Sequence, residues 1–131
     1  MTASLMLGFK VLVTDVDVVF TSNPVSFLPA NADIMLQDDV NGPRGDLCSG
    51  FYLVLPTPAS IELHKRTLTM TMTKSIIDQT ALNIVIREMM AESGNSLQVI
   101  KLNRDQFANG KVYFEMGKRM FRGESPCHPI T

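Results

Sequence analysis

The stretch Lys10–Pro24, KVLVTDVDVVFTSNP, decides the fold class and raises the question of function. Apolar residues fill positions 11–13, 16 and 18–20, so the run is near-continuous and does not alternate. This pattern predicts a strand over Lys10–Phe20 that is buried on both faces, as in the parallel sheet of an α/β protein. Asn23 and Pro24 end the strand. Asp15 and Asp17 interrupt it, and carboxylates are costly among buried aliphatic side chains unless something pairs with them.

Length and composition indicate a single globular domain. The chain has 131 residues, of which 45% are hydrophobic and 19% charged. A net charge of -1 argues against a general nucleic-acid-binding protein, so we expect no nucleic-acid partner. No apolar run approaches the roughly 18 residues that a membrane span needs. Because the chain opens almost directly into a core strand and stops at HPIT, we expect it to be a piece of a longer protein.

The rest of the sequence alternates strands and helices. The patterns predict a strand over Ala32–Leu36, a surface loop over Gln37–Asp46 and a strand over Cys48–Leu55. Two helices are predicted next, one from Thr57 that ends near Leu68–Thr73 and one from Ser75 to before Gly94. The last predicted elements are a strand over Leu97–Leu102 and a hairpin or turn followed by a strand within Phe107–Phe114. Ser75 and Asp78 have the spacing of a capping box. This order of elements predicts an α/β domain with one mixed sheet.

Asp15 and Asp17 are the first candidates for a functional site. Residues i and i+2 of a strand share one face, and the pair follows a predicted core strand. Ligands of open α/β sheets bind at the carboxyl ends of the strands. Two neighbouring carboxylates repel each other unless a cation lies beside them, and hard divalent ions that arrive with phosphates prefer oxygen ligands. The pair therefore predicts a clamp for a metal–phosphate ligand; the alternative is two exposed acids at a strand end.

One enzyme class with such a pair is the haloacid-dehalogenase-like phosphatases. Asp15-Val16-Asp17 fits their Asp-x-Asp pattern, with Asp15 as the nucleophile. These enzymes also need a later lysine and a further acidic pair at the ends of later strands. The adjacent acids of this chain, Asp38 and Asp39, come early and in a turn-rich stretch. We rank this hypothesis second.

Four blocks of sequence carry a more specific resemblance. They are LGFKVLVTDVDVVFTSNP, CSGFYLVLPTPASIELHKR, DQTALN and LNRDQFANGKVYF. Together, and in this order, they resemble the nucleotide-diphospho-sugar transferase domain of plant rhamnogalacturonan xylosyltransferases, extensin arabinosyltransferases and uncharacterised animal relatives. The resemblance implies a GT-A-like mixed sheet flanked by helices. It also implies a partial catalytic domain over residues 1–131 that lacks most of the N-terminal nucleotide-binding half.

The resemblance assigns roles to named residues. It implies that Asp15, Asp17 and the late His128 hold Mn²⁺ or Mg²⁺, although the Asn that usually follows this histidine closely is absent. It implies that Asp78 and Gln79 are catalytic: Asp78 would bind hydroxyl groups of the donor sugar, and Gln79 would lie beside the anomeric carbon.

Four further residues are implied to bind substrate. Ser49, Gly50 and Phe51 match the Ser/Thr-Gly-Phe block that borders the sugar and acceptor pocket, and Asn83 lies one helical turn beyond Gln79. Cys48 stands where the family usually has Asn.

The implied function is a glycosyltransferase. It would move a sugar from a nucleoside-diphosphate donor, expected to be a UDP-sugar, to a hydroxyl of a glycan or glycoprotein, with metal and with retention of anomeric configuration. The implied location is the Golgi or secretory-pathway lumen. Two alternatives stay open: the phosphatase that uses Asp15, and a truncated, catalytically inactive fragment, since only 14 residues precede Asp15.

Overall fold

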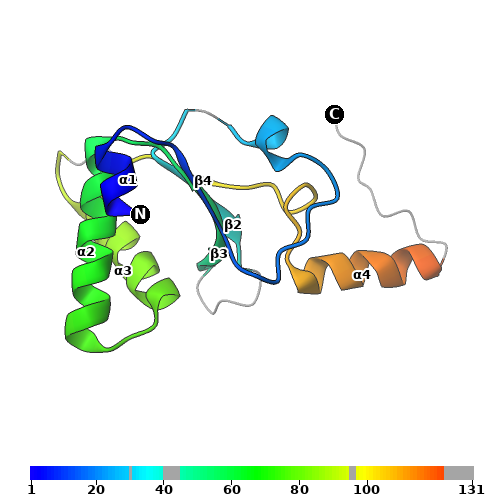
Figure 1. Cartoon of the computed structure of the whole chain (residues 1–131). Coiled ribbons are helices and arrows are strands. Elements are labelled where there is room, and N and C mark those ends of the chain that lie inside the picture. The colour runs from blue at the N-terminus through cyan, green and yellow to red at the C-terminus, as the bar shows by residue number, and fades with distance from the viewer. Residues whose placement is uncertain (30, 40–44, 95–96, 123–131) are drawn as a thin grey trace.

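A computed structural model describes residues 1–29, 31–39, 45–94 and 97–122 of the chain. Its elements, in chain order, are α1 (Thr2–Met6), β1 (Val11–Thr14), the 3₁₀ helix η1 (Pro24–Phe27), β2 (Ile34–Asp38), β3 (Leu47–Val54), α2 (Pro58–Lys74), α3 (Asp78–Ala91), β4 (Val99–Lys101) and α4 (Gly110–Phe121) (Figure 1). The prediction of an α/β fold with one mixed sheet flanked by helices is confirmed.

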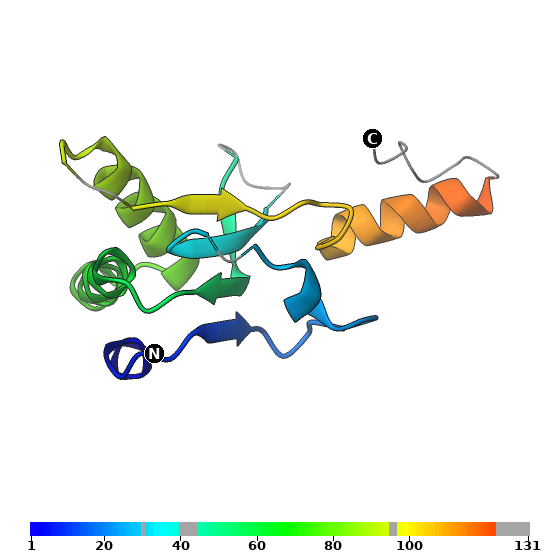
Figure 2. The same ribbon diagram turned by 90° about the horizontal axis from the view of Figure 1, so that it is seen from above.

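The sheet has four strands in the order β1-β3-β2-β4. β3 is antiparallel to both of its neighbours, with Thr14 opposite Phe51 and Leu36 opposite Tyr52. β4 is parallel to β2. As a result β1, β2 and β4 all run toward the α4 end of the molecule (Figure 2). The carboxyl ends of these three strands therefore lie at the same end of the sheet, next to the first residues of β3. We call this end of the sheet the carboxyl edge, and it is the edge meant below.

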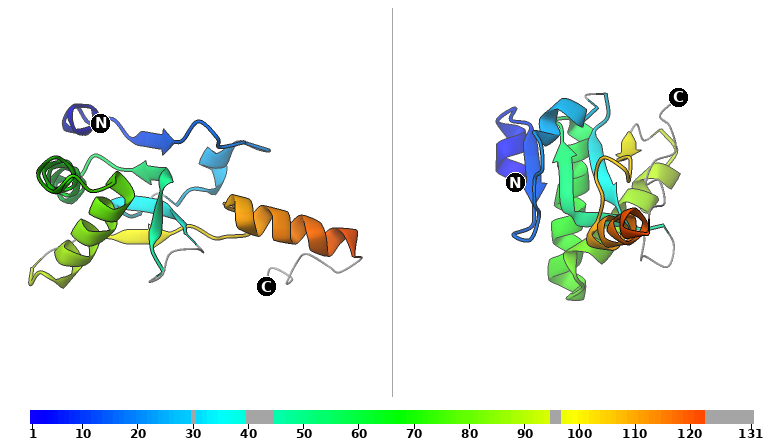
Figure 3. Two further views of the ribbon diagram at one scale, coloured as in Figure 1. Left: turned by 90° about the horizontal axis from the view of Figure 1, so that it is seen from below. Right: turned by 90° about the vertical axis from the view of Figure 1, so that its right-hand side faces the viewer.

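Side chains alternate between the two faces of the sheet, and each face has its own core. Figures 1 and 3 show α1, α2 and α3 on one side and the segment between β1 and β2 on the other. The core under the helices is built from buried residues of both layers: Leu5, Ile34, Leu36, Leu47, Tyr52, Val54, Leu63, Leu82, Val85, Ile86, Met89 and Leu97. The opposite core is smaller and contains Ala32, Met35, Phe51 and Leu102. Burial of these apolar side chains is the main force that holds the helices and the β1–β2 segment against the sheet.

The prediction of a parallel strand over Lys10–Phe20 is wrong in its length and its pairing, although β1 does pack against apolar cores on both of its faces. β1 covers only Val11–Thr14, is an outer strand of the sheet and pairs antiparallel with β3. The chain then turns, with the Val18 amide donating to the Asp15 carbonyl at 3.4 Å. Val16 and Val19 beyond the strand are exposed. The apolar run is continuous because Leu12 and Val18 join the smaller core while Val11 and Val13 join the larger one.

The predicted end of the first long helix is also wrong. α2 continues to Lys74, through the alternating stretch Leu68–Thr73. Thr67, Thr71 and Thr73 donate their hydroxyls to the backbone carbonyls four residues earlier, at 2.8, 3.0 and 2.7 Å. These bonds satisfy the hydroxyl groups within the helix, so the β-branched residues do not end it.

The predicted start of the first long helix at Thr57 is confirmed, because Thr57 is the N-cap of α2, but the predicted cap of the second helix is wrong. Ser75 is not the N-cap of α3 but the C-cap of α2, in the left-handed conformation with φ of 51°. The capping box of the chain lies at the start of α2, where the Thr57 hydroxyl accepts from the Ser60 amide at 3.2 Å and the Ser60 hydroxyl accepts from the Thr57 amide at 3.1 Å. The predicted turn or hairpin with its strand within Phe107–Phe114 is replaced by α4, whose first turn is capped by Asn109.

α4 extends away from the sheet edge at which the strands end (Figures 1 and 2). Asn109 joins the start of α4 to the sheet by donating to the Asp38 carbonyl at 3.4 Å. Among the residues that the structure describes, no helix combines the length and the apolar character that crossing a membrane requires.

Candidate functional site

The sheet edge formed by the ends of β1 and β2 brings several predicted site residues together. Asp15 directly follows β1, and its amide donates to the carbonyl of Gly50 in β3 at 2.8 Å. The Asp15 carboxylate lies over Gly50: a Cβ built on Gly50 would stand 2.6 Å from Asp15 Oδ2 and 3.4 Å from Cys48 Sγ. A side chain at position 50 would therefore collide with the carboxylate, and glycine leaves the space in which it lies.

Asp17 lies in the turn that follows β1, so the geometry expected of i and i+2 on a strand does not apply to the pair. Both aspartates are exposed at the carboxyl end of β1, which is the place that the sequence predicted. Their side chains are accessible to a ligand at this edge.

Gln79 connects α3 to two strands of the same edge. Its Oε1 accepts a hydrogen bond from the Ser49 amide at 3.2 Å, and its Nε2 donates to Asp39 Oδ2 at 2.9 Å. Ser49 and Gln79 are thus in direct contact, as their joint assignment to one site requires. Asp39, at the end of β2, is a member of the cluster that sequence reasoning missed.

Asp78 is the first residue of α3 and is exposed. Its carboxylate accepts from the Gln79 amide at 2.7 Å, which satisfies one of the free N–H groups at the helix start. A negative charge at this end is also favoured by the helix dipole. Asp78 therefore lies beside Gln79 at the amino end of α3, with its side chain at the surface.

Phe51 and Asn83 have buried side chains. The Phe51 ring packs between Phe20 and Phe107, with ring centroids 6.1 and 5.5 Å away. The side-chain oxygen of Asn83 accepts a hydrogen bond from the backbone N–H of Leu47 at 2.8 Å. Its side-chain nitrogen donates to the backbone carbonyls of Leu47 and Gln79 at 2.8 and 2.9 Å. These contacts fix β3 and α3 relative to each other. The substrate-binding roles predicted for both residues stay predictions.

Cys48 also lies beside Gly50, close to Asp15. Its sulfur accepts from the Gly50 amide at 3.3 Å. Burial raises the pKa of the Cys48 thiol, and the charges of Asp39 and Asp15 raise it further. At neutral pH this residue is therefore a neutral thiol, and it replaces the amide side chain usual in the family that the sequence resembles with a weaker hydrogen-bonding group.

The end of β2 is held by a buried carboxylate that pairs with two half-exposed cations. Asp38 was expected in a surface loop, but it is the last residue of β2 and is 4% exposed. Its carboxylate contacts Lys101 Nζ at 3.1 Å and the guanidinium of Arg104. Burial alone would raise the pKa of Asp38, but the hydrogen bonds and charges of Arg104 and Lys101 outweigh it and lower the pKa. Asp39 is thus presented from a firmly anchored strand end.

A divalent metal fits this edge in part. Asp15 and Asp17 offer the hard oxygen atoms that Mn²⁺ and Mg²⁺ prefer, in an open position where phosphate and water can complete the coordination shell. Within residues 1–29, 31–39, 45–94 and 97–122, no three His, Cys, Asp or Glu side chains are grouped as a metal site would need. The predicted third ligand, His128, lies outside the described residues.

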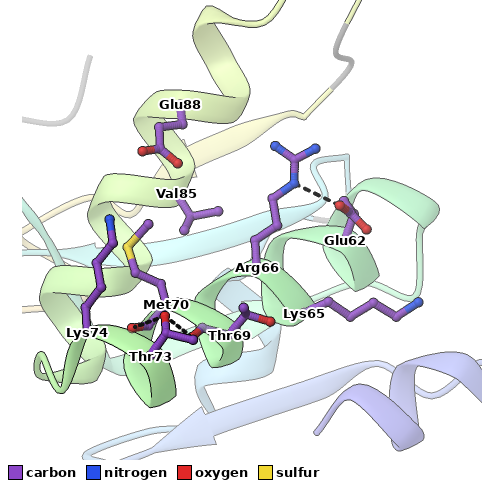
Figure 4. A pocket seen from close by; sticks show the side chains of 9 residues that line it. All are labelled: Glu62, Lys65, Arg66, Thr69, Met70, Thr73, Lys74, Val85 and Glu88. Carbon is purple, nitrogen blue, oxygen red and sulfur yellow. Dashed lines mark hydrogen bonds and ion pairs between the residues drawn. The ribbon is translucent and has the colours of Figure 1, made fainter.

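Two hollows of the described surface leave out Asp15, Asp17 and Gln79, although the smaller one reaches this edge at Leu47 and Lys101. The larger, of about 380 Å³, is a groove between α2 and α3 (Figure 4). Charged and apolar side chains line it: Glu62, Lys65, Arg66, Thr69, Met70, Thr73, Lys74, Val85 and Glu88. The smaller, of about 290 Å³, shares only Asn83 with the predicted site. We therefore define the candidate site by its converging side chains and not by a cavity.

Comparison with known proteins identifies the family. No curated protein and no solved structure matches the chain. The model of the nucleotide-diphospho-sugar transferase family matches residues 1–128, and this match spans the strand ends, the start of α3 and the connections between them. The chain therefore belongs to the nucleotide-diphospho-sugar transferase family.

Proposed function

We propose that this chain is a metal-dependent glycosyltransferase domain that uses a UDP-sugar as its donor. Membership of the family supports glycosyltransferase activity and a nucleotide-sugar donor. The single observation that carries the site is the position of Asp15: its carboxylate lies over the side-chain-free Gly50, at the edge where Gln79 bonds to Ser49 and Asp39.

The proposed metal is Mn²⁺, with Mg²⁺ as the alternative. Asp15 and Asp17 would hold it, and His128 is the proposed third ligand. When bound, the ion would supply positive charge that neutralises the departing nucleoside diphosphate.

The residues of α3 would act on the sugar. Gln79 is held between β3 and the residue after β2, and its contacts with described residues leave one N–H and one oxygen lone pair for a ligand, since an amide offers two donors and two acceptor sites. Asp78, exposed beside it, would accept hydrogen bonds from sugar hydroxyls. Held in this way, donor and acceptor would react in a fixed orientation, and positioning together with charge stabilisation would supply most of the catalysis.

Three finer features belong to the same proposal. The reaction retains the anomeric configuration, and the leaving diphosphate helps to deprotonate the acceptor on the same face of the sugar. The acceptor is a hydroxyl of a glycan or glycoprotein. The reaction takes place in the Golgi or secretory-pathway lumen. Resemblance to the plant xylosyl- and arabinosyltransferases supports these features.

The test is calorimetric titration of the chain with UDP, with and without Mn²⁺. We expect binding that requires Mn²⁺ and is weakened at least about tenfold in Asp15→Asn, because the metal loses a charged ligand. Glu88→Gln, which removes one exposed carboxylate from the outer part of α3, is the matched control and should bind like wild type. Binding of UDP that is indifferent to Mn²⁺ and to Asp15 would refute the proposed site.

Two further measurements separate the alternatives. Release of phosphate from a generic ester with Mg²⁺, lost in Asp15→Asn, would favour the phosphatase. Absence of Mn²⁺–UDP binding in this chain, together with binding in a chain extended at its N-terminus, would favour an inactive fragment of an active enzyme.

A further inference from the structure

We propose that Asp39 is a positioning residue of this site: it fixes the side-chain amide of Gln79 in the orientation that the donor sugar meets. This inference rests on the proposed function, because it takes the role of Gln79 from it. Neither the sequence motifs nor the family match assigns a role to Asp39. The direct observation is the hydrogen bond of 2.9 Å from Gln79 Nε2 to Asp39 Oδ2.

The two partners of Gln79 admit only one orientation of its amide. The Ser49 N–H can only donate, so it requires the oxygen of Gln79, and the Asp39 carboxylate can only accept, so it requires the nitrogen. Rotation of the amide by 180° would place oxygen against carboxylate and N–H against N–H. Without Asp39, the 3.2 Å bond from Ser49 would be the one remaining contact of the two that orient the amide.

Asp39 can perform this role because its own position is fixed. Its amide donates to the Asp46 carbonyl at 3.0 Å, and the preceding residue, Asp38, is buried and paired with Lys101 and Arg104. The carboxylate is thus presented from the end of β2 toward the start of α3. It also lies within electrostatic reach of Cys48, as Asp15 does, which places the two acids in one neighbourhood.

The charge of Asp39 has a chemical consequence. A carboxylate that accepts from an amide N–H polarises the amide, so that its carbonyl oxygen becomes more negative. In a glycosyl transfer, positive charge develops at the anomeric carbon. An amide oxygen that is fixed and made more negative stabilises this charge better than a freely rotating one. Asp39 would therefore act through Gln79, and it would affect the sugar more than the nucleotide.

The first arm of the test needs no ligand. The side-chain amide signal of Gln79 is recorded by NMR on the ¹⁵N-labelled full chain and assigned through its loss in Gln79→Glu. We expect the signal to shift, and its protons to exchange with water at least about tenfold faster, in Asp39→Ala than in wild type. Asp39→Asn, which is isosteric and keeps a neutral acceptor, should be intermediate, and Glu88→Gln should match wild type. An unchanged Gln79 signal in both Asp39 variants would overturn the inference.

The second arm measures Kd with Mn²⁺ for UDP and for UDP-glucose, UDP-galactose and UDP-xylose. In Asp39→Asn we expect UDP to bind within about twofold of wild type, while the best-bound sugar nucleotide weakens about tenfold. Equal effects on UDP and on the sugar nucleotide, or none on either, would overturn the positioning role. If neither wild type nor the chain extended at its N-terminus binds UDP but the Gln79 signal responds to Asp39, the orientation of Gln79 is supported and the proposed function is refuted.

Discussion

Gly50 is the residue whose identity the site depends on most directly. The space above its Cα is occupied by the Asp15 carboxylate, which a Cβ would approach to 2.6 Å. Contacts this close do not occur, so the short side chain of Asp15 or the turn that carries it must move.

Gly50→Ala should therefore damage the site more than the fold. We expect the free energy of unfolding to fall by only about 0.5–1.5 kcal/mol, because the exposed Asp15 carboxylate can rotate away, and Mn²⁺-dependent UDP binding to weaken at least about tenfold, measured by urea denaturation and calorimetry. Gly117→Ala is the control, because Gly117 lies in α4 with nothing within 4 Å of a built Cβ. Binding by Gly50→Ala that equals wild type would show that the Asp15 carboxylate need not lie over position 50.

At the residue scale, sequence could predict which side chains come near the site but not how they are used. Motif resemblance led to Asp15, Gly50 and Gln79, and the structure places all three at one sheet edge. Asp39 was missed because its partner Gln79 is 40 positions away, and no local pattern reports such a contact. The buried hydrogen bonds of Asn83 were missed for the same reason.

The boundary between α2 and α3 shows how a local signal can mislead at the scale of an element. Ser75 and Asp78 have capping-box spacing, yet α3 begins at Asp78, with Ile77 as an N-cap that makes no side-chain hydrogen bond. Ser75 instead closes α2 in a left-handed conformation. Met70, within the stretch Leu68–Thr73, packs against the core between α2 and the sheet, and this tertiary packing outweighs the weak helix propensity of the threonines around it.

The two interpretations of Ser75 predict opposite effects of one substitution. As a C-cap with φ of 51°, Ser75 is strained, and Ser75→Gly should raise the free energy of unfolding by about 0.4–1 kcal/mol. As an N-cap, Ser75 would lose its hydrogen bond in both Ser75→Gly and Ser75→Ala, and both variants would be less stable than wild type. Urea denaturation of both variants distinguishes the cases, and destabilisation by glycine would contradict the observed helix boundary.

At the scale of the whole molecule, the site exists because of strand direction. β3 runs against β1 and β2, so its first residues lie beside the last residues of both neighbours. Local patterns located β2 and β3 to within two residues and predicted the fold class, but they extended β1 too far, to Phe20. They could not give the strand order, because the order is decided by which apolar faces pack together over long distances in the chain. That order makes β1 an outer strand of the sheet, and the exposure of Asp15 and Asp17 at its end follows from this position.

The stability of the whole fold depends on two buried titratable groups in different parts of the molecule. His64 of α2 is 4% exposed, stacks on Tyr52 and donates from Nδ1 to the Ser60 carbonyl at 2.8 Å. Its Nε2 is buried without a hydrogen-bond partner among the described residues. Burial lowers the pKa of His64 below its ordinary value of 6.5; the Ser60 bond opposes this, and the N-terminal ammonium adds to it. Asp38, at the end of β2, has its pKa held below 3.8 by Arg104 and Lys101 despite burial.

Both groups make the fold sensitive to acid, in separate pH ranges. In each case the unfolded chain binds a proton at a higher pH than the folded chain does, so stability falls as pH decreases. The contribution of His64 is complete above pH 6.5 and is lost below it, whereas that of Asp38 is complete above pH 3.8 and is lost only at lower pH. Urea denaturation between pH 7.5 and 3 should therefore show that His64→Phe flattens the decline in the free energy of unfolding below pH 6.5, and that Asp38→Asn flattens it below pH 3.8.

Asp38→Asn should also lower the free energy of unfolding by about 1–3 kcal/mol at neutral pH, because two cations lose their charged partner. Declines of wild-type steepness in both variants would show that other groups govern the acid sensitivity of the fold.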